Sequence, residues 1–322
     1  MTGDEKRLVA LEPMTQQFVD ELAVAGAPPL SLRWASDVRT ALARLQSGPV
    51  GRPHTSIRDM TFPVGPKGAV HARIVRPRNA ADIMPAVMFF HGGGWIAGGH
   101  DTHDRLIKEI AVAARAAVIF VEFSRAPETP FPLPVEEAYA ATAYVANHAS
   151  HVNVDGARIA VMGDGAGGNI AAAVAILAKQ RRGPKIALQV LFYPITAANF
   201  DSASYRHWRN GPWLTRNAME RFWAAYLPSV GDRPNIIATP LSASIDQLNG
   251  LPDALVITAE VDVLRDEGEA YARKLSAAYV RTTCTRYVGT IHDFVMLNAL
   301  ADTPATRGAI GQAVCALKSA LA

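Results

Sequence analysis

The sequence predicts an α/β protein in which a mostly parallel sheet is wound between layers of helices. Short apolar runs rich in Val, Ile and Phe recur along the chain, as expected for strands that are buried on both faces. Helical segments separate these runs, and loops rich in glycine, histidine or acidic residues follow several of them. Such strand–helix alternation is typical of parallel sheets with right-handed crossovers.

Six strands and three helices account for the central part of the chain. The predicted strands lie at residues 70–75, 86–90, 117–123, 159–162, 188–193 and 254–258. The predicted helices lie at residues 105–116, 135–146 and 169–181. Because ligands of wound sheets bind beyond the carboxyl ends of the strands, the residues that follow each strand are the first candidates for function.

Two segments fall outside this alternation, and we expect them to form a helical cap. Apolar residues recur at helical spacing in the first segment, at Leu8, Leu11, Met14, Phe18, Leu22, Val38, Leu42 and Leu45. The second segment is rich in aromatic residues. The predicted organisation is therefore N-terminal cap helices at 1–50, a main domain at 51–198 and 241–322, and a second cap segment at 199–240.

Composition excludes several classes of protein. The chain has 322 residues, of which 49% are apolar and 19% are charged. A chain of this composition can bury enough apolar surface to fold, which excludes intrinsic disorder. A formal net charge of +3 does not indicate a nucleic-acid partner. The polar N-terminus leads into no apolar signal region, and no apolar stretch reaches the roughly 18–20 residues that a membrane-spanning helix needs. We therefore expect a cytoplasmic protein without a membrane partner.

Motifs that could carry chemistry stand at four points along the chain. They are His91-Gly92-Gly93-Gly94-Trp95, Gly163-Asp164-Gly165-Ala166-Gly167, Asp262-Val263-Leu264-Arg265-Asp266 and Gly289-Thr290-Ile291-His292. Consecutive glycines leave backbone N–H groups uncovered, as an oxyanion hole requires. Residues 100–104 include the side chains of metal ligands, but their place at the start of a helix favours helix capping, so we predict no metal site.

As a set, these motifs resemble the hormone-sensitive-lipase-like family of α/β-hydrolases, bacterial esterases marked by HGGGW followed by GDSAGGN. The resemblance covers nearly the whole chain and includes the segment Arg125-Ala126-Pro127-Glu128. It implies an eight-stranded, mostly parallel sheet flanked by helices, with a helical cap. It also implies a carboxylic-ester hydrolase that needs no cofactor and acts on a small-molecule ester with a short or medium acyl chain or an aryl group.

The resemblance assigns roles to individual residues. In the chain order nucleophile, acid and histidine, the three positions are 165, Asp262 and His292. His292 would act as general base and Asp262 would orient its imidazole ring, with Glu260 and Asp266 as rivals for the acid. The remaining assignments are backbone oxyanion donors at Gly93, Gly94 and Ala166, support by His91, Gly92, Asp164 and Glu128, and a substrate pocket at Trp95, Trp208, Trp213 and Phe222.

The chain departs from the family at the residue on which covalent chemistry depends. Gly165 stands where the G-x-S-x-G motif has its serine, so no acyl-enzyme can form. No other serine is a predicted substitute, because Ser124, Ser150 and Ser202 lack the surrounding elbow motif. The intact remainder of the site favours an engineered replacement of the nucleophile. A natural ligand-binding pseudoenzyme, comparable to plant gibberellin receptors, stays open, as do an amidase or lactonase activity and a homodimer.

Overall fold

One sheet runs through the centre of the molecule. The computed structural model describes residues 9–25, 35–80, 83–229, 231 and 233–322, and the described residues form eight strands in the order β1-β2-β4-β3-β5-β6-β7-β8. Strands β3 to β8 are parallel, whereas β1 and β2 pair in antiparallel fashion. The strands are β1 Thr55–Phe62, β2 Val70–Pro77, β3 Met84–Phe90, β4 Ala117–Glu122, β5 Val154–Asp164, β6 Leu188–Phe192, β7 Asp253–Val261 and β8 Thr282–Ile291. The predicted mostly parallel, eight-stranded sheet is confirmed.

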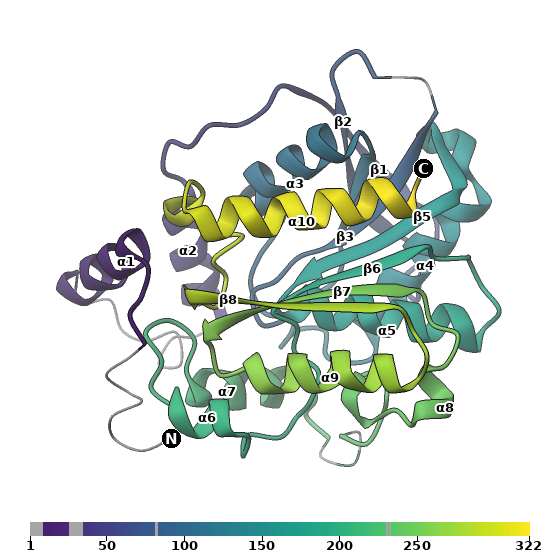
Figure 1. Cartoon of the computed structure of the whole chain (residues 1–322). Helices are drawn as coiled ribbons and strands as arrows, with labels where there is room; N and C mark the ends of the chain where they lie inside the picture. The colour runs from purple at the N-terminus through teal and green to yellow at the C-terminus, as the bar shows by residue number, and fades with distance from the viewer. Residues whose placement is uncertain (1–8, 26–34, 81–82, 230, 232) are drawn as a thin grey trace.

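Helices cover both faces of this sheet. Helices α3 and α10 pack on one face, and α4, α5 and α9 pack on the other (Figure 1). The α-helices are α1 Pro13–Val24, α2 Ala35–Gln46, α3 His100–Ala114, α4 Leu133–Asn147, α5 Ala166–Gln180, α6 Ala203–His207, α7 Arg216–Tyr226, α8 Ile245–Leu248, α9 Arg265–Ala277 and α10 Pro304–Ala320. Short 3-10 turns lie at η3 Ala149–Val152, η5 Pro240–Ser242 and η6 Asn298–Leu300.

The six predicted strands are all present, and the two strands that the apolar runs did not indicate are the two edges of the sheet, β1 and β8. The three predicted helices correspond to α3, α4 and α5. Helix α3 begins at His100, so the acidic and histidine residues that follow form its first turn, as predicted.

Helices α1, α2, α6 and α7 lie beyond the carboxyl ends of the parallel strands (Figure 1). The first two fall in the predicted N-terminal cap and the last two in the predicted second cap segment. Leu8 lies outside the described residues. The domain boundaries themselves stay a prediction.

The centre of the sheet positions the site. Helix α5 follows β5 after a single residue, and its residues from Ala166 to Ala178 are all buried. Alanine and glycine are frequent in this helix, and their small side chains let it pack closely against β5 and β6. The turn between β5 and α5 is therefore held rigidly at the carboxyl edge of the sheet.

Candidate active site

The turn between β5 and α5 consists of Gly165. Its backbone has φ +51° and ψ −113°, a left-handed conformation that glycine adopts without a steric penalty. Its N–H donates a hydrogen bond to the carbonyl of Phe192 at 3.0 Å, and its own carbonyl accepts from the N–H groups of Asn169 at 3.1 Å and Ile195 at 3.2 Å. The turn is thus the sharp strand-to-helix connection that the sequence predicts at this position.

A histidine and a carboxylate come from the two neighbouring strand ends. Asp262 follows β7 and His292 follows β8, and both side chains are buried. Nδ1 of His292 lies 2.8 Å from Oδ2 of Asp262. The other carboxylate oxygen of Asp262 accepts the N–H of Leu264 at 3.0 Å, which fixes the carboxylate relative to the ring.

The other ring nitrogen of His292, Nε2, faces position 165. A Cβ atom built on Gly165 would lie 3.2 Å from Nε2 of His292 and 3.5 Å from its Cε1. A hydroxyl one bond further out would be within hydrogen-bonding reach of Nε2. The structure therefore brings position 165, His292 and Asp262 together in the spatial order that a nucleophile, a base and an orienting acid require.

The glycine loop after β3 forms another wall of the same site. Gly93 and Gly94 both have positive φ, +104° and +63°, and both line the cavity together with Ala166. The carbonyl of Gly93 accepts hydrogen bonds from Ile96 at 3.2 Å and Ala97 at 2.9 Å, so this carbonyl is engaged within the loop. The N–H of Ala166 belongs to the first turn of α5, which has no intrahelical acceptor.

The residues predicted to support this loop contact it directly, with one exception described below. The N–H of Gly92 donates to Oδ1 of Asp164 at 3.0 Å. Nδ1 of His91 lies 2.8 Å from the carbonyl of Gly92, and its ring stacks on Phe123 with centroids 4.3 Å apart. Burial and the nearby His103 lower the pKa of His91 to about 4. His91 is therefore a neutral structural ring beneath the loop at neutral pH.

Comparison with known proteins now identifies the family. A sequence model of the alpha/beta hydrolase fold matches residues 87–296. The chain belongs to the alpha/beta hydrolase fold family. It is 35% identical to carboxylesterase NlhH of Mycobacterium tuberculosis, over 97% of this chain and 96% of that protein, and 34% identical to esterase LipI of the same organism, over 99% and 98%.

Solved structures of other family members superimpose closely. A thermostable esterase from Pseudomonas putida ECU1011 has a TM-score of 0.95 and 43% identity, over 97% of this chain and 98% of that chain. The esterase rPPE, as a serine-to-alanine mutant complexed with (S)-Ac-CPA, gives a TM-score of 0.95 and 42% identity over the same shares. The fold is therefore the α/β-hydrolase fold that the motifs indicate.

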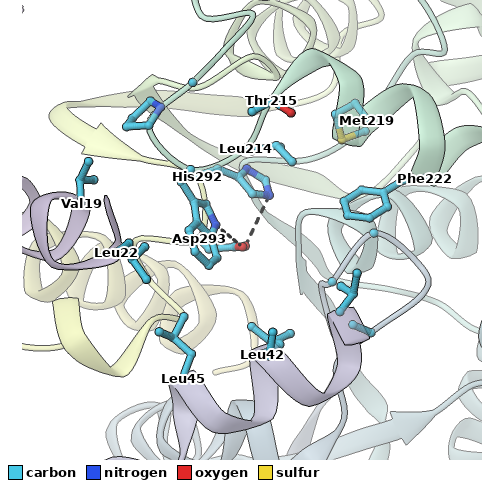
Figure 2. A pocket seen from close by; sticks show the side chains of 18 of the residues that line it. Val19, Leu22, Leu42, Leu45, Leu214, Thr215, Met219, Phe222, His292 and Asp293 are labelled. Carbon is cyan, nitrogen blue, oxygen red and sulfur yellow. Dashed lines mark hydrogen bonds and ion pairs between the residues drawn. The ribbon is translucent and has the colours of Figure 1, made fainter. Parts of the chain in front are cut away.

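In this alpha/beta hydrolase, the site opens into a cavity of about 760 Å³. Figure 2 shows that apolar side chains of α1, α2, α7 and the segment leading into α7 surround His292, among them Val19, Leu22, Leu42, Leu45, Leu214, Met219 and Phe222. Two of the four predicted pocket aromatics, Trp213 and Phe222, line this cavity.

The prediction for the other two pocket aromatics is wrong. Trp95 is fully buried and stacks on Tyr226, with ring centroids 4.1 Å apart, so it fills the core beneath the loop. Trp208 is not among the residues that line the cavity, and its ring packs against His207 at 4.4 Å. Trp95 thus packs against α7, and Trp208 packs against the hydrophobic core, so neither lines the cavity.

The prediction for Glu128 also needs correction. Its side chain is 61% exposed and pairs with Arg39 at 2.7 Å, which holds the pKa of Glu128 near 2. The loop is instead held by Arg39, which donates from Nε to the carbonyl of Ile96 at 2.8 Å and from Nη2 to that of Ala126 at 3.0 Å. Sequence reasoning missed Arg39, because a single arginine on a surface helix carries no motif.

The rival carboxylates serve structural ends. Oε2 of Glu260 accepts the N–H of Gly289 at 2.8 Å, and Oδ2 of Asp266 accepts the N–H of Ser204 at 2.7 Å. Asp262 is therefore the carboxylate that contacts the ring of His292 through Nδ1.

A second acidic residue lies beside the histidine. Asp293 is buried, lines the cavity and was not among the predicted site residues. Burial opposes a charge on His292, yet the carboxylates of Asp262 and Asp293 outweigh it and raise the pKa of His292 to about 9. Adjacency to the motif histidine was the one signal in the sequence that could have indicated Asp293.

The part of the chain that the structure describes holds neither a metal site nor a membrane-spanning helix. No group of three or more His, Cys, Asp or Glu side chains there is arranged to hold a metal ion. None of the described helices combines the length and the apolar character needed to cross a membrane.

Proposed function

We propose that this chain is a carboxylic-ester hydrolase of the Ser-His-Asp type whose nucleophile position carries glycine. The observation that carries the proposal is the 3.2 Å separation between a Cβ built at position 165 and Nε2 of His292, behind which the ring is held by Asp262. The esterase names of the relatives support the same activity. The largely apolar walls of the cavity suit a neutral ester with a short or medium acyl chain or an aryl group.

With serine at position 165, the reaction would proceed through an acyl-enzyme. The hydroxyl oxygen would attack the ester carbonyl while its proton passes to Nε2 of His292, and the carbonyl oxygen would become negative beside the N–H groups of Gly93, Gly94 and Ala166. Collapse would break the bond to the alcohol, which takes the proton from Nε2. A water molecule deprotonated by His292 would then release the acid.

The substitution Gly165→Ser tests this proposal. The variant should hydrolyse short p-nitrophenyl esters faster than the parent chain by on the order of 1,000-fold or more, which is the effect expected when a missing nucleophile is restored. Gly165→Ala is the matched control, because it adds the same Cβ without a hydroxyl and should stay inactive. Gly165→Ser combined with His292→Gln should lose the gain. An inactive but folded Gly165→Ser variant would contradict the proposal.

A ligand-binding protein without catalysis is the second candidate, and the coexistence of Gly165 with an open cavity of about 760 Å³ favours it. Under that hypothesis the chain binds a small apolar molecule and Gly165→Ser adds no activity. Amidase or lactonase activity would appear as a preference for those substrates in the same serine variant.

The origin of Gly165 belongs to the same proposal. We infer that the glycine replaces a serine by design, because the base, the acid and the glycine loop are retained around it. The relative that carries a serine-to-alanine change and holds (S)-Ac-CPA illustrates such a use. Cytoplasmic location and a homodimeric state stay predictions, which fractionation and light scattering would check.

A further inference from the structure

Asp293 occupies an unusual place for an acidic residue. It directly follows His292 with φ +66°, in the left-handed region that non-glycine residues rarely adopt. Its side chain is nine-tenths buried and faces the cavity (Figure 2). Aspartate is one of the non-glycine residues that tolerate this conformation, so it is the buried carboxylate that indicates a role beyond packing.

The two carboxylate oxygens of Asp293 have different surroundings. Oδ2 accepts a hydrogen bond from Nε1 of Trp213 at 2.9 Å, which fixes the plane of the carboxylate. Oδ1 is buried, has no hydrogen-bond partner among the described residues and lies 3.4 Å from Nε2 of His292. The unsatisfied oxygen is therefore aimed at the same ring nitrogen that faces position 165.

We propose that Asp293 is a positioning residue that acts through His292, as a second carboxylate that holds the proton on Nε2 while Asp262 holds Nδ1. The ring of His292 lies between two carboxylates, one at each nitrogen. Asp293 stabilises the imidazolium on the side where proton transfer occurs. This inference rests on the proposed hydrolase function for its catalytic consequence, but not for the proton affinity of His292.

The consequence for catalysis follows from charge balance. In each half of the reaction, an O–H bond of serine or water breaks, its proton moves to Nε2 and the oxygen forms a bond to the carbonyl carbon. The positive charge on His292 is then stabilised by Asp293 as well as by Asp262, until the proton leaves with the departing oxygen. The same stabilisation also means that His292 loses its proton, and so becomes able to act as a base, only at a higher pH.

Other ionisable groups around His292 set the background against which Asp293 acts. Asp262 after β7, Asp164 at the end of β5 and Glu267 on α9 interact with the charge of His292, and the ring of Tyr193 after β6 packs against it. His103 on α3 acts on Asp293, and Arg44 on α2 lines the same cavity. Of the carboxylates among them, only Asp262 makes a contact with the ring that is as close as that of Asp293. Removal of the Asp293 charge should therefore lower the affinity of Nε2 of His292 for its proton.

The first experiment needs no enzymatic activity. The titration of His292 is followed by NMR of ¹⁵N-histidine-labelled protein in the chain with Gly165, and His292→Gln assigns the signal. Asp293→Asn keeps an oxygen acceptor for Trp213 but removes the charge, and should lower the midpoint by at least about one pH unit, a tenfold loss of proton affinity. Asp101→Asn, at a side chain that is 88% exposed, is the matched charge control and should leave the midpoint unchanged.

The second experiment uses the Gly165→Ser background. Asp293→Asn should move the acidic limb of the kcat/KM profile to lower pH and reduce its plateau about tenfold, because a weaker base is combined with a less stabilised imidazolium. A purely structural residue would lower the plateau without moving the limb. If Asp293→Asn does not fold, Asp293→Gly fits φ +66° and serves the same test.

The outcomes separate the two proposals. A His292 midpoint that moves by less than about one unit in Asp293→Asn overturns the role of Asp293, whatever the activity of Gly165→Ser. An inactive Gly165→Ser variant with the expected shift of the midpoint overturns the proposed hydrolase and leaves the role of Asp293 in place.

Discussion

Nε2 of His103 lies 3.2 Å from Oδ2 of Asp164, with both side chains completely buried between α3 and the end of β5. Burial opposes the charge on the ring, but the Asp164 carboxylate and its hydrogen bond raise the pKa of His103. Because the other oxygen of Asp164 accepts the N–H of Gly92, this pair connects α3 and the strand end to the glycine loop.

Removal of this carboxylate should therefore be costly. Asp164→Ala leaves His103 and the N–H of Gly92 buried without their acceptor, and should lower the free energy of unfolding by roughly 3–5 kcal/mol. Asp164→Asn retains an acceptor, so its free energy of unfolding should fall clearly less than that of Asp164→Ala. Urea denaturation at pH 7 measures the free energy of unfolding of both variants. A loss below about 1 kcal/mol in Asp164→Ala would show that the buried pair does not hold the loop.

Adding a side chain at position 165 should destabilise the protein even where it restores chemistry. The φ of +51° is unfavourable for any residue with a Cβ, and that Cβ would press against His292 at 3.2 Å. We expect Gly165→Ala to lower the unfolding free energy by about 1–2 kcal/mol. Gly311→Ala is the control, because its Cβ meets nothing within 4 Å and the residue lies in α10. That variant should gain up to about 1 kcal/mol, and equal behaviour of the two would refute the strain argument.

The stability of the protein should fall between about pH 4.5 and 8 because of Glu267. Burial raises the pKa of Glu267 to about 8, although the N–H groups of Thr196 and Ala197 donate to its Oε1. The folded pKa lies above the unfolded value, so the folded state favours the protonated form. That contribution is complete below about pH 4.5 and is lost as the pH rises through 8.

Glu267→Gln tests this sign directly. The neutral amide should match the parent near pH 4.5 and exceed it at pH 9, by a difference on the order of 4 kcal/mol. His292, with its pKa raised to about 9, weakens both proteins alike between pH about 6.5 and 9. Thermal or urea unfolding at several pH values gives the comparison, and a difference that does not change with pH would exclude a buried neutral carboxyl.

Arg39 should matter more than the acidic residue of the family motif with which it pairs. Arg39→Ala removes two hydrogen bonds to the carbonyls of Ile96 and Ala126 and should cost about 2 kcal/mol. Glu128→Ala breaks only an exposed ion pair, whose effect should be close to the error of the measurement. A double-mutant cycle checks this ranking, and a larger loss in Glu128→Ala would reverse it.

The buried part of the fold was predictable because its signal is local. Strands covered on both faces need continuous apolar runs, and the central strands β3 to β7 have them. Strand β8 is largely exposed over Thr282–Arg286, and β1 is exposed over most of its length, so their sequences are polar. Such edge strands form because a neighbouring strand offers hydrogen-bonding groups to their backbone. Their own sequences carry no apolar pattern that would predict them.

The parts of the candidate site that a motif places on the backbone were predictable from the sequence. The parts that depend on which side chains meet in the folded structure were not. Gly165, Asp262 and His292 converge because three parallel strands end at one edge. Trp95 belongs to the glycine motif, but its side chain points into the core because it stacks there on Tyr226, a residue far away in the sequence. The carboxylate of Asp293 is oriented by a hydrogen bond from Trp213, eighty positions earlier in the chain, and no local pattern indicates that contact.

The walls of the cavity and its reacting groups come from different parts of the molecule. The apolar walls belong largely to α1, α2, α7 and the segment leading into α7, whereas position 165, Asp262 and His292 follow the ends of strands. Substitutions in the walls that leave Trp213 unchanged can therefore alter the shape of the cavity while His292 keeps its contacts with Asp262 and Asp293. Conversely, a substitution at position 165 leaves the residues of α1, α2 and α7, and with them the shape of these walls, unchanged.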